Sequence, residues 1–522
     1  MGIQKKGYMG KIMQVNLSSG QVSIQKIPDR VYESFLSGMG LAAFFLYHKI
    51  PENTDPLGPD NVLGFVSGLL NGTGALFSGR WMAVGKSPLT GGWGEANCGG
   101  YFAPAIKRCG VDAIFFSGIS PKPVYLYVDD KGARIRSAEQ IWGMDAVETE
   151  EFLLDHHSRK NARVACIGPA GERLSLISGI STDKGRMAAR SGLGAIMGSK
   201  GLKALVLAGT ARIRAHNRDE IKRISRICNK WVQFQPPFVP GFLTAPVGTL
   251  MRALPFVLTQ DGLLYKIMLR KWGTVSMNQI SVEMGDAPIK NWKGTSRDWG
   301  LLKSLSSNPG TFTKRETRKY HCHSCPLGCG GICENHSQAT HKPEYETVLC
   351  FGGLVMNQDM DLVFQINEKL NRAGMDSISA GHCVAFAMEC FEAGILTTQD
   401  TQGVELGWGD PLAISFLVDA MIKREGIGDI LADGVKAASQ KIGKRSHEMA
   451  VHAGGQEPGM HDSRNDPGFA LHYSADPAPG RHTNGAGLYY EMYQLWKVVK
   501  GLPRPGLVYM KKIQQYQNRC GL

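Results

Sequence analysis

Four cysteines lie close together near the middle of the chain and form its densest chemical signal. The stretch from Cys322 to Cys333 reads Cys-His-Ser-Cys-Pro-Leu-Gly-Cys-Gly-Gly-Ile-Cys. Thiolates at C-x2-C-x3-C spacing can converge on one inorganic centre, and the intervening Pro and Gly suit a tight loop whose backbone amides point at sulfur. The spacing predicts iron–sulfur or zinc ligation rather than a disulfide. A structural zinc knuckle is the alternative to an iron–sulfur cluster.

Two glycine-rich segments in the first half of the chain carry basic residues. Residues 78–100 contain Arg80 and Lys86, and residues 184–201 contain Arg186. Backbone amides that glycine leaves accessible, beside guanidinium and ammonium groups, can bind phosphate. Neither segment is a Walker A loop or a G-x-G-x-x-G fingerprint, so a plain region of tight turns is the competing interpretation. Two such segments in one domain favour a large polyanionic ligand.

The elements that must position these residues begin with a β-rich first third. Residues 9–27 alternate apolar and polar side chains around Ser-Ser-Gly, which is the pattern of a β-hairpin. A helical pattern then runs from Tyr32 to Tyr47, interrupted by Gly38 and Gly40. The remaining patterns predict strands at 62–66, 81–84, 113–116, 124–128, 163–167 and 203–207, and a helix at 148–157. Sheet therefore dominates up to a boundary expected near residue 210.

Amphipathic helices replace strands beyond that boundary. Their patterns predict helices at 361–372, 379–393, 411–426 and 429–442, before a loop-rich tail from residue 450. The expected fold class is α+β and multidomain, with a β-rich N-terminal base domain followed by mainly α-helical domains. The expected domains are a base at 1–210, a helical domain carrying the cysteines at 211–450, and an incomplete C-terminal domain at 451–522.

Composition narrows the classes of function. The chain has 522 residues and a net charge of +13, and no apolar run is long enough for a signal peptide or a membrane span. The other cysteines are scattered, as expected for reduced thiols in the cytoplasm, and an anaerobic host would suit an exposed cluster. Basic residues do not alternate with aromatic ones, which argues against a nucleic-acid partner. Positive charge favours an acidic electron-carrier protein instead.

Several motifs, taken in order, resemble the tungsten-containing aldehyde ferredoxin oxidoreductases. They are Gly85-Lys-Ser-Pro-Leu-Thr-Gly91, Ala96-Asn-Cys-Gly-Gly100, the segment from Arg186 to Lys200, the C-x2-C-x3-C motif, Pro343-Glu-Tyr-Glu-Thr347 and Gly374-Met-Asp-Ser-Ile378. The likeness covers nearly the whole chain. It implies a β-rich base that supports tungsten, or molybdenum, held by the dithiolenes of two molybdopterins, with no side-chain ligand from the protein.

The resemblance implies cofactor contacts on both glycine-rich segments and on a third motif. It implies that the pterin phosphates, bridged by Mg2+, are contacted by Arg80, Asn97, Gly99, Arg186 and Met187. It implies that one pterin ring is contacted by Asn371, Gly374, Met375 and Asp376. A bidentate guanidinium and accessible amides are what a phosphate requires. The third motif normally begins with Asp. Asn371 offers a donor as well as an acceptor, so altered ring binding is expected.

The resemblance also implies a [4Fe–4S] cluster on Cys322, Cys325 and Cys329. In the family the fourth cysteine follows directly after a motif that Asn518-Arg-Cys-Gly-Leu522 resembles, and this sequence stops there. A C-terminally truncated chain is therefore expected. The fourth ligand is left open between Cys333, Cys520 and a residue beyond Leu522.

Catalytic roles implied by the resemblance fall to Glu344 or Glu346 and to His482. A carboxylate and an imidazole beside the metal can move the proton that accompanies two-electron oxidation. Taken alone, each of these residues would be assigned to a solvated surface. The expected activity is oxidation of an aldehyde to a carboxylic acid, with electrons passing through the cluster to ferredoxin or another small carrier.

Two alternatives compete with this expectation. One is the tungsten subunit of an aromatic acyl-CoA reductase-like complex, which would reduce an activated acid and require an additional electron-transfer subunit. The other is a degenerate iron–sulfur or zinc-binding protein that lacks the pterin. The residues that line the substrate pocket would distinguish the acyl-CoA reductase from an aldehyde oxidoreductase. The metal content would distinguish the degenerate protein from an enzyme.

Overall fold

The computed structural model describes residues 7–235, 244–253, 262–336, 338–465 and 467–482, which form two compact units. Unit 1 contains the described residues up to Trp231 together with two short segments from later in the chain, 321–326 and 369–376. Unit 2 contains the other described residues. Two short segments of the later chain therefore belong to unit 1, although the sequence on either side of each belongs to unit 2.

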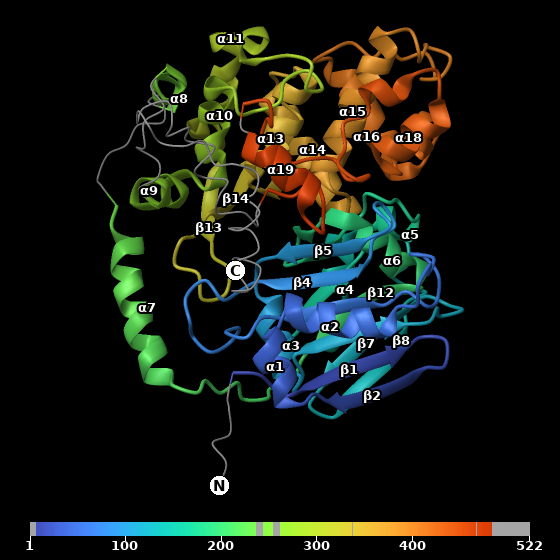
Figure 1. The fold of residues 1–522 in the computed structure, drawn as a ribbon, viewed down its shortest axis with the longest axis vertical. Coiled ribbons are helices and arrows are strands. Elements are labelled where there is room, and N and C mark those ends of the chain that lie inside the picture. The colour runs from blue at the N-terminus through green and yellow to red at the C-terminus, as the bar shows by residue number, and fades with distance from the viewer. Residues whose placement is uncertain (1–6, 236–243, 254–261, 337, 466, 483–522) are drawn as a thin grey trace. The chain divides into compact units, whose positions relative to one another are not determined.

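Unit 1 is built on two six-stranded sheets (Figure 1). The first has the order β2-β1-β6-β3-β4-β5, from β1 (Lys11–Asn16), β2 (Gln21–Lys26), β3 (Leu63–Ser67), β4 (Trp81–Lys86), β5 (Trp93–Cys98) and β6 (Ala113–Ser117). The second has the order β11-β10-β9-β12-β7-β8, from β7 (Val124–Asp129), β8 (Gly132–Ser137), β9 (Arg163–Cys166), β10 (Ile180–Thr182), β11 (Arg186–Ala188) and β12 (Leu202–Leu207). The neighbours β1–β6 and β7–β12 are parallel, and the other pairs are antiparallel.

Helices of unit 1 pack between the sheets and on their outer faces. They are α1 (Asp29–Phe35), α2 (Met39–Lys49), α3 (Phe102–Arg108), α4 (Ala146–His157), α5 (Pro169–Glu172) and α6 (Leu193–Ser199), and α7 (Arg218–Gln233) leads out of the unit. Side chains of α3 and α6 share one core with both sheets, while α1 and α2 cover the other face of the first sheet and α4 that of the second. Strand alternation produces this layering, because Leu126 and Val128 of β7 enter the shared core whereas Tyr125 and Tyr127 face α4.

Unit 2 is mainly helical. Its helices are α8 (Thr244–Ala253), α9 (Gly262–Trp272), α10 (Asn278–Met284), α11 (Ser296–Ser304), α12 (Pro309–Thr313), α13 (Tyr345–Cys350), α14 (Met360–Ala373), α15 (Ser377–Glu392), α16 (Pro411–Lys423), α17 (Ile427–Leu431), α18 (Gly434–Ile442) and α19 (Pro467–Ala475). The last residues of α14 belong to unit 1. Helix α15 is buried from Ile378 to Cys390 and packs against α13, α16 and α18. A small antiparallel sheet joins β13 (Glu316–Tyr320), β14 (Gly330–Asn335) and β15 (Gln338–His341).

The predicted α+β class and most predicted elements are confirmed, and three details differ. Residues 93–98, expected within a glycine-rich loop, form strand β5, which shows that glycine at strand positions does not prevent pairing. The helix expected at 429–442 is divided into α17 and α18, since Gly434 takes a φ of +83°. The sheet β13-β14-β15 lies in a region expected to be helical. No helix among the described residues is long and apolar enough to cross a membrane.

Candidate functional site

The hairpin of β4 and β5 fixes the first predicted arginine. Arg80 directly precedes β4, and Asn97 lies in β5 opposite Met82. The Nη2 of Arg80 donates to the backbone oxygen of Asn97 at 3.0 Å, and its Nε donates to the Asn97 side-chain oxygen. These two bonds hold the guanidinium plane against the strand and leave Nη1 for another acceptor.

Gly99 permits a close convergence of charged and sulfur groups within unit 1. A Cβ atom at this position would lie 2.6 Å from the Sγ of Cys322, 3.1 Å from Nη1 of Arg186 and 3.5 Å from Nη1 of Arg80. Any side chain here would therefore force the Cys322 thiol to move and would press on the Arg186 guanidinium, while it would only touch that of Arg80. We call Arg80, Asn97, Gly99 and Arg186 the basic cradle. The structure brings all four together and places Cys322 against them.

Buried carboxyl groups lie beside this cradle. Asp183 accepts a hydrogen bond from the backbone N–H of Tyr101 at 2.8 Å, and burial raises the pKa of its carboxyl. Glu150 accepts from the backbone N–H of Lys184 at 2.7 Å, and burial raises its pKa to about 8. Met187, the remaining predicted residue here, lies in β11 opposite Ser181 of β10.

The loop carrying Cys322 and Cys325 is anchored by backbone hydrogen bonds inside unit 1. The N–H of His323 donates to the oxygen of Gly100 at 3.0 Å, and the N–H of Phe77 donates to that of Ser324 at 2.9 Å. The N–H of Cys325 closes a turn by donating to Cys322 at 3.0 Å. Both thiols are free and half-buried. This turn therefore presents two cysteines at a fixed spacing.

The other two cysteines of the motif belong to unit 2. Cys329 is half-buried like the first two. Cys333 differs, because it lies in strand β14 with its thiol buried against the backbone oxygen of Phe312 at 3.8 Å. Burial raises the pKa of the Cys333 thiol to about 12. The tight loop expected over 322–333 thus ends before Cys333, at the start of the strand.

The third predicted motif, which follows α14, is also bound into unit 1. Gly374, with a φ of +74°, ends the helix and accepts from the N–H of Gly179 at 2.9 Å. Met375 forms an isolated bridge with Ser178. Asp376 pairs with Arg190 at 2.7 Å, and both side chains are largely buried. The motif is therefore held by backbone pairing and by a buried ion pair.

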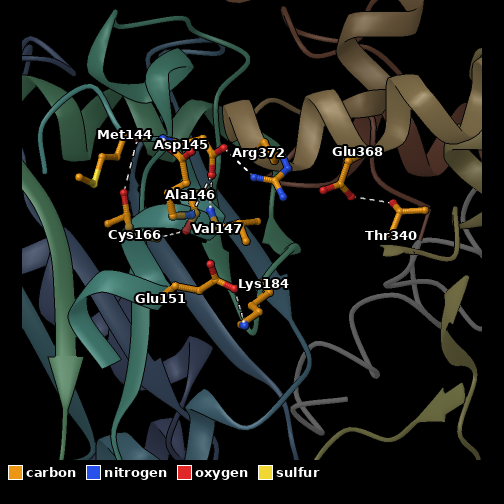
Figure 2. A network of polar contacts seen from close by, with 12 residues as sticks. Met144, Asp145, Ala146, Val147, Glu151, Cys166, Lys184, Thr340, Glu368 and Arg372 are labelled. Atoms are coloured by element: carbon orange, nitrogen blue, oxygen red, sulfur yellow. Dashed lines mark hydrogen bonds and ion pairs between the residues drawn. The ribbon is translucent and has the colours of Figure 1, made fainter. Parts of the chain in front are cut away.

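Two further residues of this motif have distinct surroundings. The backbone oxygen of Asn371 accepts from the N–H of Gly374 at 3.3 Å, and its side chain is half-buried. Arg372 pairs with Asp145 at 2.8 Å (Figure 2). Asp145 also caps α4 by accepting from two backbone N–H groups of that helix. One carboxylate thus ties the start of α4 to the third motif.

Unit 2 brings together the predicted Glu346 and His482. Glu346 lies in the first turn of α13, and its Oε1 is 3.0 Å from Nε2 of His482. Its Oε2 accepts from the backbone N–H of Met460 at 2.8 Å. The other predicted carboxylate, Glu344, precedes α13, is exposed and accepts from the hydroxyl of Thr274. Of the two glutamates, only Glu346 contacts the predicted histidine.

Three residues that the sequence interpretation missed complete this cluster. The hydroxyl of Tyr345 lies 2.6 Å from Nε2 of His482 and 3.1 Å from Nε2 of His461. The Nδ1 of His461 lies 2.7 Å from Oδ2 of Asp286. Ligand-capable atoms of Glu346, His461 and His482 lie within 4.8 Å of one another. We call the five residues, Asp286, Tyr345, Glu346, His461 and His482, the acid–histidine cluster.

No local signal marks Asp286 or His461 in the sequence. Tyr345 lies inside the quoted Pro-Glu-Tyr-Glu-Thr motif, so that motif was the one available clue. Asp286 follows α10, and His461 lies in an irregular segment far along the chain. Tertiary folding alone brings them to α13, and periodicity does not report such contacts.

The fold and the two sets of residues define the class of protein. A solved structure, the active site complex BamBC of benzoyl coenzyme A reductase in complex with 1,5 dienoyl-CoA, matches 99% of this chain and 76% of that chain with a TM-score of 0.76 and 24% identity. At this identity the likeness establishes the fold. The family model of the aldehyde ferredoxin oxidoreductase N-terminal domain matches residues 12–209, and that of domains 2 and 3 matches residues 257–519.

Curated relatives agree with these family models. The chain is 31% identical over 503 residues to a tungsten-containing aldehyde ferredoxin oxidoreductase of Pyrococcus horikoshii, covering 95% of this chain and 76% of the relative. It is 31% identical to the Thermococcus kodakarensis enzyme of that name, covering 91% and 74%. It is also 27% identical to the aliphatic sulfonate oxidoreductase, WOR-like subunit, of Pyrococcus furiosus, covering 92% and 76%. This chain belongs to the aldehyde ferredoxin oxidoreductase family and is an oxidoreductase of that type.

Proposed function

We propose that the protein oxidises an aldehyde to a carboxylic acid at a tungsten bis-molybdopterin centre and passes the electrons through a [4Fe–4S] cluster to ferredoxin or another small carrier. The observation that carries this proposal is the contact of the buried Glu346 carboxylate with His482 at 3.0 Å, in a chain of this family. A buried carboxylate against an imidazole is suited to accept protons from a reacting group.

The basic cradle fits the phosphates of such a cofactor. Two arginines converge over a glycine that leaves no room for a side chain, and Asn97 orients the first of them. Permanent positive charge in a fixed fork is what a phosphate binds best. Gly374, Met375 and Asp376 would contact one pterin ring, and Met187 lies beside the cradle on β11. When bound, the tungsten–pterin centre would take the two electrons of the substrate. Bridging Mg2+ stays a prediction.

The side chains of Glu346 and His482 in unit 2 would accept the protons that the reaction releases. Oxidation of RCHO with H2O to RCOOH releases two protons and two electrons. Glu346 can accept one proton at Oε1, which lies 3.0 Å from Nε2 of His482. The bond from Met460 fixes the second oxygen, so the carboxylate cannot turn away. Burial excludes bulk water from this exchange.

Cys322, Cys325 and Cys329 are the proposed cluster ligands. Cys333 is a poor fourth ligand, because its thiol is buried in the β-sheet against Phe312. We expect Cys333→Ser to leave the iron and sulfide content per chain unchanged and Cys329→Ser to lower both by at least half. Loss of iron in the Cys333→Ser variant alone would make that residue the fourth ligand.

The proposed function is tested on protein produced without oxygen in tungstate-supplemented cells. We expect about one tungsten per chain, organic phosphate, and reduction of a viologen dye by at least one member of an aldehyde panel. Glu346→Gln should retain tungsten and lose at least 100-fold in kcat, since an amide accepts no proton at this site. Glu368→Gln is the matched control, because Glu368 also lies in unit 2 and accepts a hydrogen bond from Thr340 at 2.6 Å.

Two outcomes would redirect the proposal. If Glu344→Gln rather than Glu346→Gln abolishes turnover, the exposed carboxylate carries the chemistry. Zinc without tungsten would remove the enzyme assignment. An aliphatic sulfonate belongs in the panel because one relative bears that name. An aromatic acyl-CoA is tested in the opposite direction, with reduced viologen as the electron donor. Turnover of either one in place of aldehydes would change the substrate class.

A further inference from the structure

The five residues of the acid–histidine cluster form one continuous line of contacts within unit 2. Asp286 contacts His461 at 2.7 Å, His461 contacts the Tyr345 hydroxyl at 3.1 Å, and that hydroxyl contacts His482 at 2.6 Å. His482 in turn contacts Glu346 at 3.0 Å. The proposed function uses only the last pair. The line beyond it, from Tyr345 to Asp286, has no assigned role.

Asp286 sets the direction of the hydrogen bonds along this line. An ionised carboxylate only accepts, so Nδ1 of His461 must carry the proton and donate it. The Nε2 of neutral His461 then has a lone pair and accepts from the Tyr345 hydroxyl. The Tyr345 oxygen is left to accept from Nε2–H of His482. Every donor therefore points toward Asp286, as a path that moves protons away from His482 requires.

Burial makes the far end of the path a suitable place for a proton. The side chains of Asp286 and His461 are 1% and 10% exposed. The ring of Phe469 stacks on that of His461 with centroids 4.4 Å apart. In such surroundings a carboxylate stabilises an adjacent imidazolium far more strongly than it would in water. The Oδ1 of Asp286 accepts no hydrogen bond from any described residue, so the described hydrogen bond of this carboxylate is the one between Oδ2 and His461.

Other charged groups near His461 do not compete for this role. Asp462, its chain neighbour, is paired with Arg464 at 2.6 Å. Among the described residues, Tyr345, His482 and Asp286 contact the His461 ring, and Glu346 belongs to the same cluster. Asp286 alone gives His461 a direct ion-pair partner among these.

We propose that His461, held by Asp286, is the acceptor of the second proton released by the oxidation, an inference that rests on the proposed function. A proton enters at Nδ1 of His482 as Nε2–H of that ring passes to the Tyr345 oxygen. The Tyr345 hydroxyl proton passes at the same time to Nε2 of His461. One proton is gained at His482 and one is delivered to His461, which becomes an imidazolium beside ionised Asp286. Tyr345 and His482 end with their original charges, and His461 acts through them without touching the substrate.

The first test needs no tungsten. In protein carrying 15N-labelled histidine, NMR should show His461 as the Nδ1–H tautomer, with its signal assigned from His461→Asn. Asp286→Asn should lower the pKa of His461 by at least one pH unit, because an amide does not stabilise an imidazolium. The Nε2–H tautomer in the unmodified protein, or an unchanged pKa in Asp286→Asn, would overturn the proposal.

The second test uses the tungsten-loaded enzyme. His461→Asn and Asp286→Asn should each lower kcat about 10-fold with little change in KM, and should raise the solvent deuterium isotope effect. Tyr345→Phe should match them, since it interrupts the same path. The control is His341→Asn, because His341 also contacts a tyrosine hydroxyl, that of Tyr320 at 2.8 Å, in the same unit. Tungsten content must equal that of the unmodified enzyme in all variants.

The outcomes separate the two proposals. A protein that turns over no substrate refutes the proposed function, whereas the NMR titration still decides whether Asp286 and His461 form the proton acceptor. Full turnover by His461→Asn with an unchanged isotope effect overturns the relay and leaves the proposed function intact. Tight binding of one Zn2+ per chain, lost in both His461→Asn and Glu346→Gln, would make these residues a metal site and would also overturn the relay.

Discussion

The basic cradle of unit 1 and the acid–histidine cluster of unit 2 carry different kinds of charge, but both are built around a glycine. The cradle gathers permanent charge from Arg80 and Arg186, which keep their protons at any physiological pH. The cluster gathers groups whose protons can move. Each depends on one glycine, Gly99 or Gly459, at which an added Cβ would collide with the groups that converge there. Under the proposed function, the cradle would control whether the cofactor is held, and the cluster would control how fast the cofactor is used.

Gly99→Ala should have the largest effect. The added methyl would lie 2.6 Å from Sγ of Cys322 and 3.1 Å from Nη1 of Arg186, so the cradle must open. We expect tungsten, phosphate and iron per chain to fall about 10-fold while the protein remains folded, as metal analysis and circular dichroism would show. Gly92→Ala is the control, since its Cβ would meet only the Thr90 hydroxyl, at 3.8 Å. Normal tungsten content in Gly99→Ala would break the comparison.

Gly459→Ala should have a smaller effect of a different kind. Its Cβ would overlap Nδ1 of His482 and approach Oε1 of Glu346 to 3.2 Å, which displaces the histidine. We expect kcat to fall about 10-fold with tungsten and iron retained. Gly407→Ala serves as the control in unit 2, because its nearest neighbour, Cβ of Asp410, is 3.9 Å away. Loss of tungsten in Gly459→Ala would show that the cluster also holds the cofactor.

Glu150→Gln should have the smallest effect, on stability rather than activity. Burial raises the pKa of Glu150 to about 8, whereas an unfolded glutamate titrates near ~4.3. Between these values the folded protein holds a proton that the unfolded chain has lost, so this group makes stability fall as pH rises. The glutamine variant lacks this pH-dependent contribution to stability, because its side chain does not titrate. We expect its decline in Tm between pH 5 and 8 to be smaller by about 2 °C.

The neighbouring Glu151→Gln is the control for that measurement. Glu151 is half-exposed and pairs with Lys184 at 2.6 Å, so its loss should not change the pH slope. A slope that is the same in Glu150→Gln and in the unmodified protein would show that Glu150 is ionised when buried. Retained activity in both variants would confirm that titration in unit 1 serves the fold and not the reaction.

Much of unit 1 could be predicted from sequence because its signals are local. The hairpin of β1 and β2 and the strands β6, β7 and β12 follow from alternation and from buried runs between turns. Gly374 ends α14 as its position indicated. Strand β5 escaped prediction because Gly94 and the glycines on either side of the strand break its pattern. Gly99, directly after the strand, is nevertheless what allows the backbone to pass close to Cys322.

The candidate site was predictable only where a motif carried it. Arg80, Asn97, Gly99 and Arg186 were identified through glycine-rich motifs, and the structure brings them together. His461 and Asp286 were not, because a single histidine in an irregular segment has no distinguishing neighbours. The burial of the Cys333 thiol against Phe312 was equally invisible, since strand β14 begins within a run of glycines typical of loops.

The composition of unit 1 from three separate stretches has a consequence for synthesis on the ribosome. The first 231 residues emerge well before 321–326 and 369–376, so the nascent base must wait for the bond from His323 to Gly100 and for the ion pairs of Arg372 and Asp376. Until then Ser178 lacks its bridge partner Met375, and the basic cradle lacks the neighbouring Cys322 thiol. A ligand that needs the finished surroundings of the cradle would therefore bind after translation of the third motif.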